Sequence, residues 1–187
     1  MKVRCKWSLK TEHEKLYHDT EWGKPIHNDS LLFEFITLEG AQAGLSWSTI
    51  LAKREGYKKA FDNFDIKKIA LYDDEKLISL ATNNEIIKNK LKIKSTKTNA
   101  QAALKIINEY GSLDKYLWGF VNYKPIINHW KDHSEIPATS KVSDTMSKDL
   151  KKRGFKFFGS TICYAFMQAT GMINDHTIDC FKHPINN

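Results

Sequence analysis

The sequence predicts an all-α protein, a bundle of helices, and three observations support this class. Apolar residues recur at helical spacing along most of the chain, whereas the sustained alternation of apolar and polar residues that marks strands is hard to find. All four prolines fall between the helical segments. At 187 residues the chain is long enough for one functional unit, or for two small helical subdomains with a cleft between them.

The individual helices follow from capping residues and apolar spacing. Residues 31–43 follow three favourable N-cap residues at positions 28–30. Residues 66–71 and 74–81 each begin behind an aspartate, which indicates short helices joined by tight turns rather than strands. We expect further helices at residues 56–61, 85–110 (with a break near Ser95), 112–120, 143–153 and 160–170.

The composition is that of a globular protein with a basic surface. The net charge is +7, and lysine is densest in residues 86–97 and 147–159. This charge favours a polyanionic partner such as nucleic acid, although lysines that only solubilise the surface would give the same value. No stretch resembles a membrane span or the apolar segment of a signal peptide, so we expect a cytoplasmic protein without a membrane partner. A monomer is the simplest expectation for its oligomeric state.

Glu39 is an acid on an apolar helix face. On a helical wheel of residues 31–43 it shares an arc with core-type residues, whereas Glu34 and Thr37 fall on the opposite side. Burying an unpaired carboxylate is costly, so such a group is usually paired or kept for chemistry. The alternative is a glutamate at the edge of the apolar stripe that pairs with a lysine.

Aromatic residues lie close to this acid in the sequence. The segment "GLSW", residues 44–47, follows the helix with a flexible glycine, an apolar leucine and Trp47, which suits a pocket or a wedge. Trp7, Tyr17 and Trp22 add three more aromatic side chains. An acid among aromatic rings suits a flat, electron-poor or cationic ligand.

Both ends of the chain supply a cysteine and a histidine. Cys5 and His18 lie near the N-terminus, and His176 and Cys180 have the spacing H-x3-C, one turn apart on a helix, so that both can reach one ion. Such a closed tetrahedral shell predicts one structural zinc ion that joins the two ends; the alternative is a free thiol among ordinary histidines. Cys163, amid apolar neighbours, is predicted to be a core residue. The remaining histidines have no such partner and are predicted to lie at the surface: His13, His27, His129, His133 and His183.

The segment "LKKRGFKFFGSTICYAFMQATG" predicts a helix, a short turn, and a second helix that begins after Gly159, at Ser160 or Thr161. Backbone amides at the start of the second helix, with Lys156 and the basic residues 151–153 close by, would bind a phosphate. Such helix-hairpin-helix units hold a DNA backbone without reading its sequence. The alternative is two packed helices with a solvated loop.

With these residues assembled, the chain resembles the 3-methyladenine DNA glycosylase I family, the Tag type of the helix-hairpin-helix glycosylases. The resemblance covers nearly the whole length, because the motifs of the family follow one another in order: "RCKW", "YHDTEWG", "LEGAQAGLSW", "YLWGFVN" and "SKDLKKRGFKFFGSTICYAFMQATGMINDH". The segment "IIKNKLKI" departs from it, with lysines where relatives often have arginines and a histidine, which concerns only contacts to the DNA backbone.

The resemblance implies a role for each residue of the predicted pocket. Glu39 becomes the essential, base-recognising catalytic residue. Tyr17 and Trp47 line the pocket, and Trp7 and Trp22 shape its wall.

Outside the pocket, the resemblance places Gly44 and Leu45 at the gap left by an extruded nucleotide. It gives no catalytic role to Asp175, which lies near the position of a catalytic aspartate in the wider superfamily. The hairpin analysis adds Lys156, Gly159 and Ser160 to the predicted DNA contacts, and the zinc ligands of the family fall on the four residues already derived, Cys5, His18, His176 and Cys180.

The implied activity is that of a monofunctional glycosylase. Such an enzyme would flip 3-methyladenine out of alkylated double-stranded DNA and excise it by hydrolysis, leaving an abasic site without strand cleavage. The alternative is a non-catalytic, zinc-stabilised DNA-binding module. A zinc-dependent hydrolase or deaminase is disfavoured, because the sequence lacks the motif H-x-E with P-C-x-x-C, and four protein ligands leave the metal no water to activate.

Overall fold

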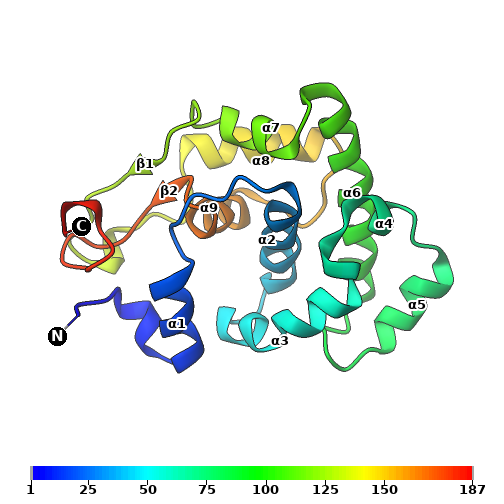
Figure 1. Ribbon diagram of the computed structural model, residues 1–187, viewed down its shortest axis with the longest axis horizontal. Helices are drawn as coiled ribbons and strands as arrows, with labels where there is room; N and C mark the ends of the chain where they lie inside the picture. The colour runs from blue at the N-terminus through cyan, green and yellow to red at the C-terminus, as the bar shows by residue number, and fades with distance from the viewer. Residues whose placement is uncertain (1, 187) are drawn as a thin grey trace.

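The structure, a computed structural model that describes residues 2–186, is a bundle of helices, as predicted (Figure 1). None of the helices in this range is long and apolar enough to cross a membrane. The elements in chain order are η1 (Lys6–Leu9), α1 (Glu12–Thr20), α2 (Asp29–Gln42), α3 (Trp47–Ala60), η2 (Asp62–Phe64), α4 (Ile66–Ala70), α5 (Asp74–Thr82), α6 (Lys90–Tyr110), α7 (Leu113–Gly119), β1 (Ile126–Ile127), η3 (His133–Glu135), α8 (Lys141–Lys152), α9 (Ser160–Ala169), β2 (Ile173–Asn174) and η4 (Pro184–Asn186).

Helix α2 lies at the centre of the bundle and contacts α3, α6, α7 and α9 (Figure 1). All residues from 32 to 41 are buried, so the helix has no solvent face. The prediction that Glu34 and Thr37 face away from the core is therefore wrong. Glu34 is buried and paired with Arg54 Nε at 2.6 Å, and the Thr37 hydroxyl donates to the Phe33 carbonyl at 3.0 Å.

Side-chain caps begin three helices where the sequence predicts them. Asn28 accepts a hydrogen bond from the Leu31 amide at 3.0 Å at the start of α2. Asp65 and Asp73 cap α4 and α5 in the same way. Each cap satisfies a backbone amide that has no partner within its own helix, which fixes where the helix begins.

Helix α1 is absent from the predicted helices, because its residues include few apolar side chains. The signal that marks it is a T-x-x-E capping pattern, in which Thr11 accepts a hydrogen bond from the Glu14 amide at 3.1 Å. Helix α3 likewise begins earlier than predicted, at Trp47, where the Ser46 side chain accepts from the Thr49 amide at 3.2 Å. The cap of α3 directly precedes Trp47, a residue of the predicted pocket.

Helix α6 begins at Lys90, later than predicted, and continues through Ser95 without a break. The Ser95 hydroxyl donates to the Lys92 carbonyl at 2.6 Å, which satisfies the polar side chain inside the helix. Helices α7, α8 and α9 begin and end within about two residues of the predicted positions, the ordinary uncertainty of helix ends.

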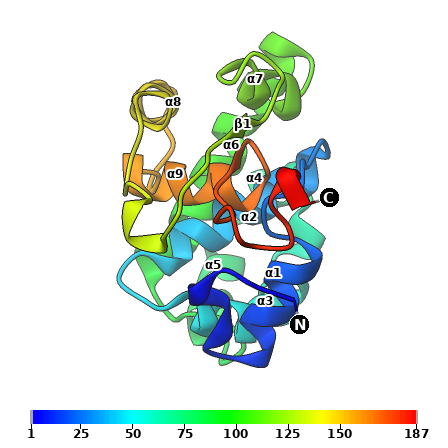
Figure 2. The same ribbon diagram turned by 90° about the vertical axis from the view of Figure 1, so that its left-hand side faces the viewer.

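The strands β1 and β2 pair in parallel, with Ile126 opposite Ile173. Two residues are too short to show an alternating pattern, which explains why the sequence does not predict them. This pairing holds the C-terminal segment against the connection between α7 and α8. The N-terminal segment, in blue, and the C-terminal segment, in red, lie on the same side of the molecule (Figures 1 and 2), where the Phe181 amide donates to the Val3 carbonyl at 3.0 Å.

Candidate functional site: an acidic aromatic cavity beside a cysteine and histidine cluster

A cavity of about 160 Å³ lies between α1, α2, α3 and α9. An engineered cavity of about 150 Å³ in another protein holds a benzene ring, so this volume suits one small planar ring system. The five residues predicted for the base pocket all line it, together with five that the sequence does not indicate. The lining residues are Trp7, Tyr17, Trp22, Glu39, Trp47, Gln42, His133, Ile136, Ala165 and Gln168.

Three polar atoms buried at this site have no hydrogen-bond partner among the described residues: Tyr17 Oη, Glu39 Oε2 and Trp47 Nε1. An unpaired buried polar atom is unfavourable, so native structures rarely keep one without a reason. Three such atoms around one cavity indicate that a ligand supplies their partners. The set includes a hydroxyl, an indole donor and a carboxyl oxygen, which together match the polar edge of a heterocycle.

The carboxyl group of Glu39 is held in a dry environment. Burial raises the pKa of Glu39 to about 8. Burial and then the nearby Glu39 raise the pKa of Tyr17 well above its usual value. The guanidinium of Arg54 does not neutralise Glu39, because its Nε and Nη1 atoms are bound to Glu34 at 2.6 Å and Glu21 at 2.7 Å. A cationic ligand in the cavity would therefore meet an acid that Arg54 does not neutralise.

The aromatic side chains of the wall contact one another. Tyr17 lies between Trp7 and Trp47, with ring centroids 6.3 and 5.4 Å away, and Trp7 packs edge-on against Trp22 at 5.0 Å. The start of α3 is also fixed to α1, because the Ser48 hydroxyl donates to the buried Glu14 carboxylate at 2.8 Å. Packing and hydrogen bonding thus hold Tyr17 and Trp47 in place before a ligand arrives.

The loop between α2 and α3 carries Gly44 and Leu45, next to the cavity. Gly44 has a φ of +80°, a conformation that favours glycine, and Leu45 is 40% exposed although it is apolar. The loop is anchored from α6, since Lys92 Nζ donates to the carbonyls of Ala41 at 2.9 Å and Ala43 at 2.6 Å. Leu45 is therefore presented to solvent on a fixed turn.

The predicted hairpin is present between α8 and α9. Asn99 of α6 holds its backbone, donating to the Lys156 carbonyl at 3.1 Å and accepting from the Lys156 amide at 2.8 Å. The Lys156 side chain is exposed, and Gly159 begins α9 without a side-chain cap. The Ser160 hydroxyl is bound to Ser143 and Asp144, so the backbone amide of Ser160 is the part left for a ligand.

Arg153 does not lie ready for a phosphate, which corrects the prediction for that residue. Its guanidinium is paired with Glu109 at 2.7 Å and with Asp149 at 2.8 Å, and it lies over the rings of Tyr110 and Tyr116. The hydrogen bonds to Glu109 and Asp149 raise the pKa of Arg153. Arg153 thus connects α6, α7 and α8 rather than serving the hairpin.

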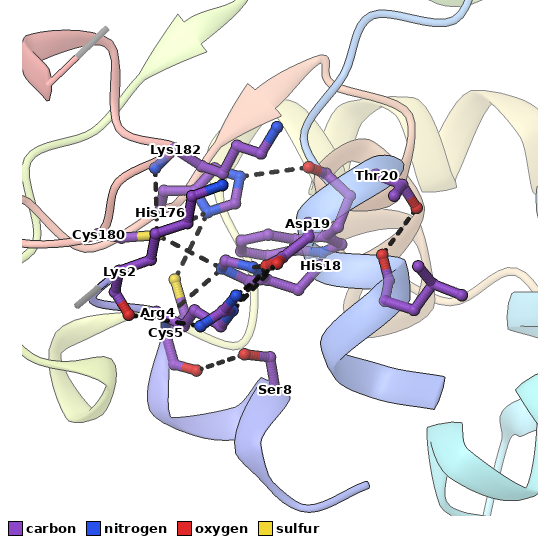
Figure 3. A network of polar contacts seen from close by, with 12 residues as sticks. Lys2, Arg4, Cys5, Ser8, His18, Asp19, Thr20, His176, Cys180 and Lys182 are labelled. Atoms are coloured by element: carbon purple, nitrogen blue, oxygen red, sulfur yellow. Dashed lines mark hydrogen bonds and ion pairs between the residues drawn. The ribbon is translucent and has the colours of Figure 1, made fainter. Parts of the chain in front are cut away.

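Cys5, His18, His176 and Cys180 form one buried cluster whose ligand atoms all lie within 4.8 Å of one another (Figure 3). Cys180 Sγ is 3.4 Å from His18 Nε2 and 3.5 Å from His176 Nδ1, and Cys5 Sγ is 3.5 Å from His176 Nδ1. This cluster could hold a metal ion. His176 and Cys180 lie in a turn after β2, not on a helix as predicted, and the turn achieves the same convergence.

The far side of each imidazole is also bound. His18 Nδ1 lies 2.9 Å from Asp19 Oδ1, and His176 Nε2 lies 3.2 Å from the Trp22 carbonyl, so both rings turn their other nitrogen to the thiols. Hydrogen bonding by Cys5, then by the two histidines, lowers the pKa of Cys180. The thiolate, the form that binds metals, is thus favoured at Cys180.

His183 differs from its prediction as a surface residue, because it is fully buried, with Nε2 3.1 Å from the Asn128 carbonyl. His133 is exposed as predicted, and it also lines the cavity. Both belong to segments whose position depends on distant contacts, so the local sequence carries no signal for them. Cys163 is buried in the core as predicted.

The helical fold, the hairpin and the acidic aromatic cavity together define a DNA glycosylase. Comparison with known proteins identifies the family of glycosylases. Residues 7–183 match the family model for methyladenine glycosylases. The chain is 44% identical over 183 residues to DNA-3-methyladenine glycosylase 1 of Escherichia coli (strain K12). The aligned region covers 98% of each of the two chains. The chain belongs to the methyladenine glycosylase family.

Solved structures agree with this assignment. A crystal structure of 3-methyladenine DNA glycosylase I has a TM-score of 0.93 and 44% identity, covering 97% of this chain and 100% of the other. A variant of such a glycosylase in complex with 3-methyladenine has a TM-score of 0.94 at 35% identity, covering 98% and 99% of the two chains.

Proposed function

We propose that this enzyme hydrolyses the N-glycosyl bond of 3-methyladenine in alkylated double-stranded DNA and leaves an abasic site. The observation that best supports this substrate is the set of unpaired polar atoms on Tyr17, Glu39 and Trp47 inside an aromatic cavity. The similarity to a glycosylase solved with 3-methyladenine supports the same base.

The damaged nucleotide must first leave the duplex, because a stacked base cannot reach an enclosed cavity. Leu45, exposed on its anchored turn beside Gly44, is suited to occupy the gap that the nucleotide leaves. Lys156 and the backbone amides of Gly159 and Ser160, at the start of α9, are suited to bind a backbone phosphate.

Alkylation at N3 leaves adenine with a formal positive charge, which makes the base a good leaving group. When the bond between C1′ and N9 breaks, its electron pair goes to the base and neutralises that charge. Water then forms a bond to C1′ of the oxocarbenium-like sugar and gives its proton to solvent. No group on the protein needs to protonate the base, so its main task is selection.

Glu39 performs this selection through its charge. A cationic base favours the ionised form of the buried carboxyl group, which then accepts hydrogen bonds from the N–H edge of the base. The aromatic wall adds cation–π attraction of about 0.5–2 kcal/mol. Unmodified adenine is neutral and gains much less from both.

The cysteine and histidine cluster fits one zinc ion. Zinc binds cysteine at about 2.3 Å and histidine at about 2.0–2.1 Å, which for a tetrahedron places sulfur and nitrogen about 3.6 Å apart. The observed distances of 3.4 and 3.5 Å match this geometry. When bound, zinc would cross-link both ends of the chain through Cys5, His18, His176 and Cys180, and four protein ligands give it a structural role.

The test is to incubate the protein with methylated duplex DNA and to analyse the released bases. We expect free 3-methyladenine, and DNA that breaks at abasic sites only after treatment with alkali. Duplex binding without base release would instead indicate a non-catalytic DNA-binding module. Strand breaks formed without alkali would contradict the hydrolytic mechanism.

A further inference from the structure

Asp175 is fully buried and accepts four hydrogen bonds. Its Oδ1 accepts from Asn128 Nδ2 and Trp130 Nε1, and its Oδ2 accepts from Tyr164 Oη and Gln168 Nε2, each at 2.7 Å. Two donors on each oxygen use the accepting capacity of the carboxylate. Asp175 therefore has no free lone pair with which to activate water.

Only one of these four donors lines the base cavity, and it is Gln168. Because a carboxylate only accepts, the amide nitrogen of Gln168 must be the atom that faces Asp175. The amide oxygen, Oε1, is consequently turned away from Asp175, and it accepts no hydrogen bond from the residues 2–186 that the structure describes. Gln168, a half-buried residue of the cavity wall, thus carries an acceptor that has no partner among the described residues.

We propose that Asp175 fixes the amide of Gln168 so that its oxygen faces the base, and that Gln168 thereby selects a purine with an amino group at position 6. This inference rests on the proposed function, since it concerns which alkylated purine the cavity accepts. An amino group at position 6 donates to the amide oxygen. An oxo group at the same position would place two acceptors against each other and leave both unpaired.

An aspartate is required for this arrangement, and asparagine is not equivalent. The indole of Trp130 can only donate, so an asparagine at position 175 would turn its oxygen toward Trp130 and its NH₂ group toward Tyr164 and Gln168. The tyrosine hydroxyl can rotate and accept. The amide of Gln168 would have to flip, which would present its NH₂ group to the cavity.

The test compares two free bases that differ at position 6, 3-methyladenine and 3-methylhypoxanthine, with dissociation constants obtained from tryptophan fluorescence. Wild-type protein is expected to prefer 3-methyladenine by about 10-fold or more, the value of one hydrogen bond gained against one mismatched. Gln168→Met, which keeps the length of the side chain but removes its amide, should bring the two constants close together. Asp175→Asn should bring them together or reverse the preference.

Tyr164→Phe is the matched control, because it removes another donor to Asp175 but leaves Gln168 in place. It should retain the preference of the wild-type protein. Melting temperature and metal content are measured for each variant, because Asp175 is next to the cluster residue His176 in the sequence.

Several outcomes overturn the inference. They are equal or absent binding of the two bases by wild-type protein, an unchanged preference in Gln168→Met, and a folded Asp175→Asn variant that keeps the preference. If Asp175→Asn does not fold, Gln168→Met still decides the question. Excision of 3-methyladenine by wild-type protein, measured separately, shows whether the proposed function survives such a result.

Discussion

The base cavity and the cysteine and histidine cluster are neighbouring groups of buried polar side chains that differ in one respect. In the cavity, polar atoms of Tyr17, Glu39 and Trp47 have no partner among the described residues. In the cluster, each imidazole is hydrogen-bonded on its far side by Asp19 or by the Trp22 carbonyl. A group whose polar atoms converge on one point and are supported from outside suits permanent occupation. A group left open suits a ligand that comes and goes.

The largest expected effect comes from removing the zinc ion that we propose for the cluster. Cys180→Ser, or a strong chelator, should release one zinc ion per chain and lower the melting temperature by about 10 °C or more, since the energy of a structural zinc site contributes directly to folding. Zinc is measured by elemental analysis and unfolding by circular dichroism. Cys163→Ala, at a buried cysteine outside the cluster, should keep the zinc. A zinc-free wild-type protein of unchanged stability would contradict the structural role.

The second largest effect is expected from removing the charge of Glu39 in the cavity. Glu39→Gln should reduce excision of 3-methyladenine by about 100-fold or more, because it removes the charge that favours a cationic base, while the fold and the affinity for DNA remain. The matched control is Glu34→Gln, on the same helix and also buried, but paired with Arg54. That variant should lower the melting temperature and leave excision nearly unchanged below it. Equal loss of excision in both variants would show that Glu39 acts only through the fold.

A smaller effect is expected from removing the carboxylate of Asp19, which is hydrogen-bonded to the far side of the His18 imidazole. Hydrogen bonding from Arg4 lowers the pKa of Asp19 to about 2, so this carboxylate stays charged beside His18. Asp19→Asn should weaken zinc binding by about 10- to 100-fold, as measured by competition with a chromophoric chelator. Glu12→Gln, on an exposed position of the same helix, should leave it unchanged. Weaker binding of 3-methyladenine in Asp19→Asn with full zinc content would contradict the separation of the two sites.

The smallest effect is a dependence of stability on pH. Burial raises the pKa of Glu39 to about 8, whereas an unfolded chain loses this proton at about pH 4.3. Between these values the folded protein keeps a proton that the unfolded chain has released, so rising pH favours unfolding. The melting temperature of Glu39→Gln relative to wild-type protein should therefore be about 5 °C higher at pH 8 than at pH 5. A difference that does not change with pH would mean that the carboxyl group is not buried.

Much of this fold could be predicted because local signals determine it. Helices α2, α4 and α5 begin at the predicted caps, which act within a few residues of the chain. The burial of Glu34 and the pairing of β1 with β2 could not be predicted, because both depend on elements packed from distant parts of the sequence. A helical wheel shows which residues share a face, but it does not show how many faces are covered.

The candidate site follows the same rule. The sequence indicates the cluster and part of the cavity because their residue types are conspicuous. These are cysteine and histidine in the cluster, and tryptophan and an acid on an apolar helix in the cavity. The sequence does not indicate that Gln42, His133 and Gln168 line the cavity. A neutral amide has no characteristic pattern, and the loop that carries His133 is positioned by tertiary bonds such as that between Trp130 and Asp175.

Because the two ends of the chain form one cluster, this part of the fold can be completed only late in synthesis. Cys5 and His18 leave the ribosome early, but their cluster waits for His176 and Cys180, after helices α1 to α9 have been made. Trp22 lines the cavity and packs against the ring of His176 at 4.6 Å, so one wall receives its support only at that late step. A nascent chain that stops before residue 176 would have the hairpin between α8 and α9 but an unsupported cavity wall.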